Sequence, residues 1–280
     1  MKIIYTPKGR AREYGPLAAN LIKGCPHGCR YCYVPAVLHI DREEFHAGCR
    51  PIPDALEKFG ADCEALQKAG NAEPIHMSFT CDPWPSPGVT MRGEQFVVNK
   101  AIEDCRRLTK SAIRHAHTYG QAVNVLTKSG IEAGIYELLS LLQPADTFGV
   151  TLTCNEVGDR KFWEPRAETT QQRIEALRLA HDLGIRTRVS FEPVLFPEQT
   201  LAMIRLVRPI ADLIQVGKTN LHQGCIPDLR QLEAGIDWAD FARKAKALLE
   251  DLGGEYYIKH DLAAFLEPAP FHMPVDTGAI

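Results

Sequence analysis

Short apolar segments rich in β-branched residues alternate with longer segments of helical periodicity along this chain of 280 residues. The predicted strands span 18–24, 75–80, 122–127, 147–153, 185–191 and 212–217, with a doubtful seventh at 255–259. The predicted helices between them span 53–69, 92–118, 131–142, 168–183, 198–207 and 237–252. Such alternation is typical of βαβ units that build a parallel sheet. Because the units fall short of the number in a closed barrel, we predict an α/β fold, a partial (βα)6 TIM-like barrel with parallel strands.

The chain has no linker or repeat that would suggest a domain boundary, so we expect one domain over residues 1–280. Its core would cover about 18–220, and residues 221–280 would add a helix, a strand and a proline-containing tail over the open barrel. A net charge of −3 gives no overall positive field for nucleic acid or membrane. No apolar stretch is long enough to span a bilayer, and we expect a cytoplasmic protein.

Three cysteines lie close together in the first loop, Cys25, Cys29 and Cys32, with the spacing C-x3-C-x2-C. Three thiolates on one short loop can bind three irons of a [4Fe–4S] cube and leave the fourth iron open for chemistry. The alternative is a structural zinc site with His27 as fourth ligand, which would make the chain a zinc-stabilised binding module without catalysis. The other six of the nine cysteines are scattered, and we expect most of them to be small buried hydrophobic residues.

Polar residues follow each predicted strand at its carboxyl end. After the cysteine loop come Cys81-Asp82, Lys128-Ser129, Cys154-Asn155-Glu156, Glu192-Pro193 and Lys218-Thr219-Asn220. Parallel α/β sheets bind their ligands at this edge. The sequence therefore predicts one ligand site that these residues surround.

The stretch from Gly24 to Tyr33, with Tyr31 just before the third cysteine, resembles the signature of the radical S-adenosylmethionine (SAM) superfamily, in its spore photoproduct lyase-like branch. Further segments fit in the same order: Asp82-Pro83-Trp84, Thr127-Lys128-Ser129, and Glu164-Pro165 followed by Arg173. The resemblance implies an enzyme, with lyase as a candidate class, in which Cys25, Cys29 and Cys32 hold a [4Fe–4S] cluster and the open iron binds SAM. Reductive cleavage of SAM would give a 5′-deoxyadenosyl radical that abstracts hydrogen from a substrate.

The resemblance also implies partners for each part of SAM and a source of electrons. Tyr31 would pack beside the adenine, and Lys128 and Arg173 would bind the carboxylate. The residues expected to hydrogen-bond the ribose or methionine are Thr151, Thr153 and Asn155, which alternate along one strand and its extension. An electron donor such as flavodoxin or ferredoxin would reduce the cluster.

Two carboxylates and one thiol are candidates for further roles. Asp82 and Glu192 would bind the ammonium or ribose of SAM, hold substrate or act as acid or base, and either carboxylate can instead cap the following helix. Cys81 would donate a hydrogen atom to a product radical if its thiol faces the pocket, and otherwise it is packing. We assign Cys81 and Asp82 as catalytic candidates and Glu192 as a cofactor ligand.

The substrate is not identified by any motif. Cations between Arg106 and His117 on one predicted helix, together with Arg186 and Arg188 on a strand, would serve phosphate contacts in an enzyme that repairs or modifies nucleic acid. The alternative for these residues is a solvated helix face. The acidic net charge and the lack of a basic run interleaved with aromatic residues favour the alternative.

Overall fold

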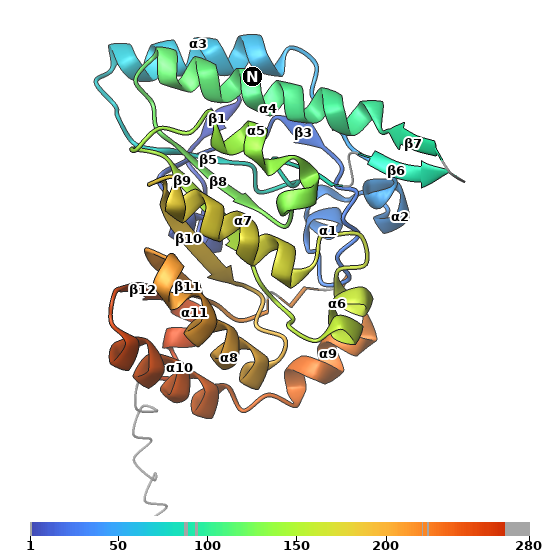
Figure 1. Ribbon diagram of the computed structural model, residues 1–280, viewed down its shortest axis with the longest axis vertical. Coiled ribbons are helices and arrows are strands. Elements are labelled where there is room, and N and C mark those ends of the chain that lie inside the picture. Colours follow the sequence, from blue (N-terminus) through green and yellow to red (C-terminus); the bar gives the residue numbers. More distant parts are fainter. Residues whose placement is uncertain (1, 87–88, 93–94, 220, 223, 267–280) are drawn as a thin grey trace, which may run out of the picture.

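One sheet of eight strands organises the protein, which we describe from a computed structural model (Figure 1). The structure describes residues 2–86, 89–92, 95–219, 221–222 and 224–266. The strands follow the spatial order β1 (Ile4–Tyr5), β2 (Leu17–Ala19), β5 (Ile75–Met77), β8 (Val123–Thr127), β9 (Thr147–Thr151), β10 (Arg186–Phe191), β11 (Leu213–Val216) and β12 (Glu255–Ile258). All neighbours pair in parallel except β1, which is antiparallel to β2.

The sheet is a partial barrel, as the alternation of the sequence predicts. Its edge strands β1 and β12 have no pairing with each other in the described residues. The doubtful seventh strand is present as β12 and pairs with β11 in the same sheet. The C-terminal region therefore extends the sheet, which favours the interpretation as one domain. The tail expected to cover the barrel lies from residue 267 onward outside the described residues.

Six helices correspond to the predicted ones and cover the outside of the sheet (Figure 1). They are α3 (Ala55–Lys68), α4 (Lys100–Thr118), α5 (Ile135–Leu139), α7 (Thr170–Asp182), α8 (Pro197–Val207) and α10 (Trp238–Leu252). Local sequence explains their ends: α7 begins at a capping box in which Thr169 and Gln172 bond each other's backbone amides, and α8 has a proline in its first turn. Their apolar faces and the sheet bury one continuous core that includes Phe59, Phe148 and Phe191.

Two predicted helices were wrong in extent. The segment predicted as helix from residue 92 forms a hairpin, β6 (Val89–Arg92) and β7 (Gln95–Val98), because β-branched and aromatic residues dominate it. Helix α4 begins only after Asn99, whose side chain accepts the Ile102 amide. The helix predicted at 131–142 is divided at Gly134, whose φ is 64°, into a 3₁₀ turn η2 (Ile131–Ala133) and the short α5.

The predicted strand at 18–24 was wrong in extent: it is divided into β2 and β3 (Ile22–Lys23), and β3 pairs with β4 (Arg50–Pro51) in a separate two-stranded sheet. Further short elements that the sequence did not indicate are η1 (Gly9–Tyr14), α1 (Val34–Leu38), α2 (Arg42–His46), α6 (Val157–Trp163), η3 (Arg208–Ile210), α9 (Pro227–Ala234) and α11 (His260–Ala263). In the described part of the chain, no helix has the length and apolarity needed to cross a bilayer.

The N-terminal segment η1 lies along the open side of the barrel. The Gln215 side chain of β11 donates to Glu13 O at 3.3 Å, and the Tyr257 hydroxyl of β12 donates to the Glu13 carboxylate at 3.0 Å. The ring of Tyr14 packs on His76 of β5, with centroids 5.4 Å apart. Segment η1 therefore connects the two sides that the sheet leaves unpaired, and it brings Arg10 and Tyr14 into the barrel.

We expect the substitution Gly130→Ala to destabilise the loop that follows β8. A Cβ at Gly130 would lie 2.5 Å from the carbonyl carbon and 2.6 Å from the oxygen of Gln172 on α7. Relieving such a contact requires a backbone shift. The free energy of unfolding measured in urea should therefore be lower than that of the wild type by about 2 kcal/mol. Gly158→Ala is the matched control, since nothing lies within 4 Å of its Cβ position. Equal stability of Gly130→Ala and the wild type would contradict this helix–loop packing.

Candidate functional site

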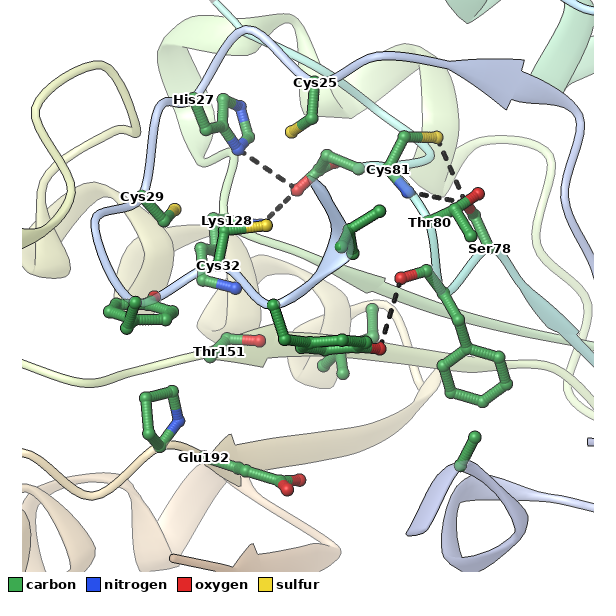
Figure 2. A pocket seen from close by; sticks show the side chains of 18 of the residues that line it. Cys25, His27, Cys29, Cys32, Ser78, Thr80, Cys81, Lys128, Thr151 and Glu192 are labelled. Carbon is green, nitrogen blue, oxygen red and sulfur yellow. Dashed lines mark hydrogen bonds and ion pairs between the residues drawn. The ribbon is translucent and has the colours of Figure 1, made fainter. Parts of the chain in front are cut away.

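The carboxyl ends of the strands surround a single described cavity that holds most of the predicted site residues (Figure 2). Its empty volume is about 1150 Å³, including the part open to solvent, which is ample for a cofactor and a small ligand. The predicted residues that line it are Cys25, Cys29, Tyr31, Cys32, Cys81, Asp82, Lys128, Thr151 and Glu192. Among the described residues, Thr153, Asn155 and Arg173 do not line it.

The cysteine loop is held in a tight conformation that turns its three thiols to the inside. Gly24 has a φ of 76°, and a Cβ there would lie 2.4 Å from Gly48 O, so only glycine fits. The Cys32 amide donates to Cys29 O at 3.1 Å and closes the turn. Figure 2 shows the three sulfur atoms facing a common space, with Lys128 beside them. They form no disulfide in the described structure.

The chemistry of these thiols fits a multi-iron centre. Burial raises the pKa of Cys25 and of Cys29 to about 12 and that of Cys32 to about 11. Positive metal charge is therefore needed to hold them as thiolates. No group of three or more His, Cys, Asp or Glu side chains in the described residues is placed to hold a single metal ion. In a [4Fe–4S] cube each thiolate binds a different iron atom, so the three sulfur atoms can lie farther apart than the ligands of a single metal ion.

His27 is engaged elsewhere and does not offer a fourth zinc ligand. Its Nε2 accepts the Ser86 amide at 3.0 Å, so the proton is on Nδ1, which lies 3.4 Å from the Asp82 carboxylate. Burial lowers the pKa of His27 to about 4, and the ring is neutral. Both nitrogens thus serve to hold the loop against the barrel, and the zinc interpretation loses its proposed ligand.

Asp82 is surrounded by hydrogen-bond donors. Its Oδ1 accepts the Thr127 hydroxyl at 2.7 Å and the Trp84 amide at 2.9 Å, and its Oδ2 accepts the Lys128 amide at 2.7 Å. With His27 on the same Oδ2, the carboxylate joins the cysteine loop to the segments after β5 and β8. All the described partners of this buried carboxylate donate to it, so the contacts hold these segments together, and the catalytic role predicted for Asp82 stays a prediction.

Arg173 lies behind the cavity wall rather than in the cavity. Its Nη2 is 2.5 Å from the Glu164 carboxylate, its Nη1 donates to Thr151 O at 2.9 Å and its Nε donates to Glu168 O at 3.0 Å. These bonds use all three nitrogens of a side chain that is fully buried. The structure thus does not bring Arg173 to the position expected for a partner of the SAM carboxylate.

The partner of Arg173, Glu164, also accepts the hydroxyl of Tyr31. Burial alone would raise the pKa of Glu164, but Arg173 and Lys128 lower it to about 2, so the carboxylate is charged. The Lys128 Nζ lies 5.7 Å from the centroid of the Tyr31 ring, and Lys128 remains inside the cavity. Glu164 and Arg173 therefore orient Tyr31 from behind, while Lys128 is the cation at the cysteine end.

Thr151 and Thr153, which we predicted to lie on the same face of one strand, do not lie on a common face. Strand β9 ends at Thr151, which lines the cavity. Beyond the strand the alternation is lost, and the Thr153 hydroxyl is buried 3.5 Å from Cys154 Sγ. Asn155 is exposed, and its amide donates to the Gln199 side chain at 2.6 Å.

Glu192 lies at the other end of the cavity among residues that the sequence analysis missed. Its Oε1 is 2.8 Å from Arg10 Nη2, and its Oε2 is 2.5 Å from both the Tyr14 hydroxyl and Lys259 Nζ. Burial would raise its pKa, but Lys259 and its neighbours lower it. Arg10 and Tyr14 precede the first predicted strand, and Lys259, although it ends the predicted strand at 255–259, was not linked to Glu192 by anything in the sequence.

Cys81 lies in the cavity wall, on the loop that follows β5. Its Sγ is 3.0 Å from the Ser78 hydroxyl, and the thiol lines the cavity. Burial raises the pKa of Cys81 well above its usual range, so the S–H bond is retained at neutral pH. Cys154, the comparable cysteine after β9, is fully buried and does not line the cavity in the described residues.

Comparisons with known proteins agree with this arrangement. The sequence model of the radical SAM superfamily matches residues 19–208. A spore photoproduct lyase variant solved with bound AdoMet and a dinucleoside spore photoproduct superimposes with a TM-score of 0.65 at 13% identity, covering 90% of this chain and 78% of that one. SuiB of Streptococcus suis gives 0.59 at 11% identity over 88% of this chain, which spans only 49% of SuiB. These likenesses show the fold. No curated protein matches.

We expect Asp82→Asn to destabilise the protein although it preserves shape. An amide nitrogen in place of either carboxylate oxygen would face donors only, which leaves buried groups without acceptors and costs about 2 kcal/mol. Urea unfolding of the metal-free protein measures the effect, with the exposed Asp54→Asn as the control. If Asp82→Asn lost catalysis at wild-type stability, Asp82 would be a reacting group instead.

Proposed function

Because this chain belongs to the radical SAM superfamily, we propose that Cys25, Cys29 and Cys32 bind its [4Fe–4S] cluster and that SAM binds beside them in the same cavity. The superfamily uses these cofactors, and bound together they supply a 5′-deoxyadenosyl radical by reductive cleavage of SAM. The observation that carries the assignment is the set of three thiols facing the space that Lys128 also enters. The radical then abstracts hydrogen from a substrate in this cavity.

The chain's own residues bind and orient SAM. Lys128 is proposed to hold the carboxylate: burial would lower its pKa, but Cys29 and Glu164 raise it, so the ammonium stays charged. Tyr31 packs beside the adenine, and Thr151 hydrogen-bonds the ribose or methionine part. Arg173 acts as a positioning residue, since it holds Glu164, which in turn holds the Tyr31 hydroxyl.

The substrate is proposed to lie between the cysteine end and the Glu192 end of the cavity. Both ends line the same space, and Cys81 lines it as well. A thiol that keeps its proton is suited to return a hydrogen atom to a product radical, and Cys81 is our candidate for this step. The buried surroundings protect a radical from water. A reducing compartment such as the cytoplasm suits such a site.

Repair or modification of nucleic acid is a weaker candidate. The spore photoproduct lyase structure holds a dinucleoside lesion, but several of the cations that would bind phosphates here are engaged within the protein. Arg106 is buried and donates to Pro85 O, Lys110 pairs with Glu137, and Arg186 pairs with Glu255. Turnover of ultraviolet-irradiated DNA by the reconstituted enzyme, measured by chromatography of digested DNA, would establish this activity for the same site.

Replacement of any one motif cysteine should abolish the cluster. After anaerobic reconstitution, we expect about four irons per wild-type chain and much less in Cys25→Ala, Cys29→Ala and Cys32→Ala. 5′-Deoxyadenosine formation from SAM with dithionite should disappear in the same variants. Cys63→Ala, at a fully buried site outside the cavity lining, is the matched control and should keep its iron. A colourless wild-type protein carrying zinc would contradict the assignment.

Loss of the Lys128 ammonium should weaken SAM binding. A charge-assisted hydrogen bond contributes about 1.5–3 kcal/mol, so Lys128→Met should raise the dissociation constant of SAM about tenfold or more. Equilibrium dialysis with the cluster-loaded protein measures this, and Lys246→Met on the surface of α10 is the control. Unchanged affinity in Lys128→Met would show that another group holds the carboxylate.

A further inference from the structure

The outer side of the cysteine loop, away from the cavity, is covered by positive side chains. Arg30, between the second and third cysteines, is exposed and lies 4.0 Å from the centroid of Phe162 on α6. Arg166 is exposed and packs so closely on Gly28 that a Cβ there would be 2.7 Å from its Nη2. Neither arginine lines the cavity among the described residues.

Two residues of α6, Lys161 and Phe162, extend this surface. Lys161 is exposed, and Phe162 beside it keeps 37% of its surface accessible. We call Arg30, Lys161, Phe162 and Arg166 the α6 face. In Figure 1, α6 lies next to α1, which directly follows the cysteine loop. The α6 face is thus an apolar side chain framed by three cations at the rim of the loop.

Negative charges also lie near the loop. Helix α6 begins after the exposed Glu156 and carries Asp159 in its first turn, whose carboxylate accepts the Gln199 side chain at 2.6 Å. Asp82 and Glu164 have side chains only 6% and 1% exposed, and both are already bonded on the cavity side. Glu43 and Glu44 are exposed on α2, beside Arg42, which makes that side of the loop mixed in charge. The α6 face itself therefore presents three exposed cations, whereas the α2 side is mixed in charge.

From this asymmetry we propose that the α6 face is the docking site for the electron donor, a small acidic one-electron carrier protein. The proposal rests on the proposed function, which requires one electron for each SAM cleaved. In the proposed function, the radical and the substrate lie on the cavity side of the cysteine loop. A macromolecular substrate must therefore approach through the cavity. A reductant must instead approach the cysteines from the outer side of the loop. Arg30 belongs to the α6 face on that side and directly follows Cys29 in the sequence.

The chemistry of the encounter is a single electron transfer. The carrier is oxidised by one electron and the cluster is reduced by one, with no bond made or broken between the proteins. Opposite charges raise the association rate of such partners by about 10- to 1000-fold, and the effect falls with salt. Phe162 supplies the apolar centre that an interface needs within its charged rim.

Charge reversal on the α6 face tests the proposal. We would reduce cluster-loaded protein with a purified flavodoxin as the acidic carrier and follow bleaching of the cluster absorption by stopped flow. The double variant Arg30→Glu/Lys161→Glu should react about tenfold more slowly than wild type at low salt, and the wild-type rate should fall with added salt. Arg30→Gln/Lys161→Gln, a milder change, should give an intermediate rate.

Two controls separate docking from other effects. Arg114→Glu/Arg178→Glu reverses exposed charges near the C-terminal ends of α4 and α7, and it should keep the wild-type rate. Dithionite, a small reductant, should reduce all variants equally. Failure of dithionite to support SAM cleavage in the wild type would overturn the proposed function, independently of docking.

The proposal is wrong if flavodoxin reduces the double variant as fast as the wild type. It is also wrong if the double variant keeps that rate but loses affinity for a short single-stranded oligonucleotide, since the α6 face would then bind nucleic acid. Calorimetric titration of oxidised flavodoxin should show the affinity lost in the double variant and retained in the Arg114→Glu/Arg178→Glu control.

Discussion

The carboxylate of Asp82 connects the parts of the site that must stay in register. A buried carboxylate is costly unless donors replace its water, and here the cysteine loop and the segments after β5 and β8 provide those donors through His27, Trp84, Thr127 and the Lys128 amide. None of these segments satisfies the charge alone. The carboxylate therefore fixes where the thiols lie relative to Lys128, which is the geometry on which binding of SAM beside a cluster depends.

A second buried charge works in the same way for Tyr31. Its hydroxyl reaches Glu164, and Glu164 is neutralised by Arg173, whose remaining nitrogens bind backbone carbonyls of β9 and of the loop before α7. Removing one partner of such a pair would leave an uncompensated buried charge. The pair therefore holds the aromatic ring against the cavity, and the arginine expected to bind SAM directly is engaged in this pair.

The order of strands and the residues at their carboxyl ends were predictable, because periodicity and parallel topology together place those residues at one edge. The orientation of individual side chains was not. Thr153 lies beyond the end of β9, where alternation no longer applies, and Arg173 was captured by Glu164, a contact that spacing does not reveal. Arg10 meets Glu192 across 182 residues, and this pairing depends on η1 lying along the open side of the barrel. Local patterns contain no information about such long-range contacts.

The short cysteine loop has two sides with different roles, an inner side that faces the cavity and an outer side that faces away from it. With three thiols directed inward over so few residues, backbone carbonyls are left facing outward, and Arg42 binds two of them, those of Cys29 and Cys32, at 3.1 and 2.7 Å. A centre held by three thiolates becomes more negative when it accepts an electron, and cations that contact the ligand backbone stabilise that charge. Arg42 therefore supports the loop, and in the proposed function its charge would also favour reduction of the cluster. The backbone of the loop is thus held from the outer side, while the inner side remains free for the proposed cofactors and substrate.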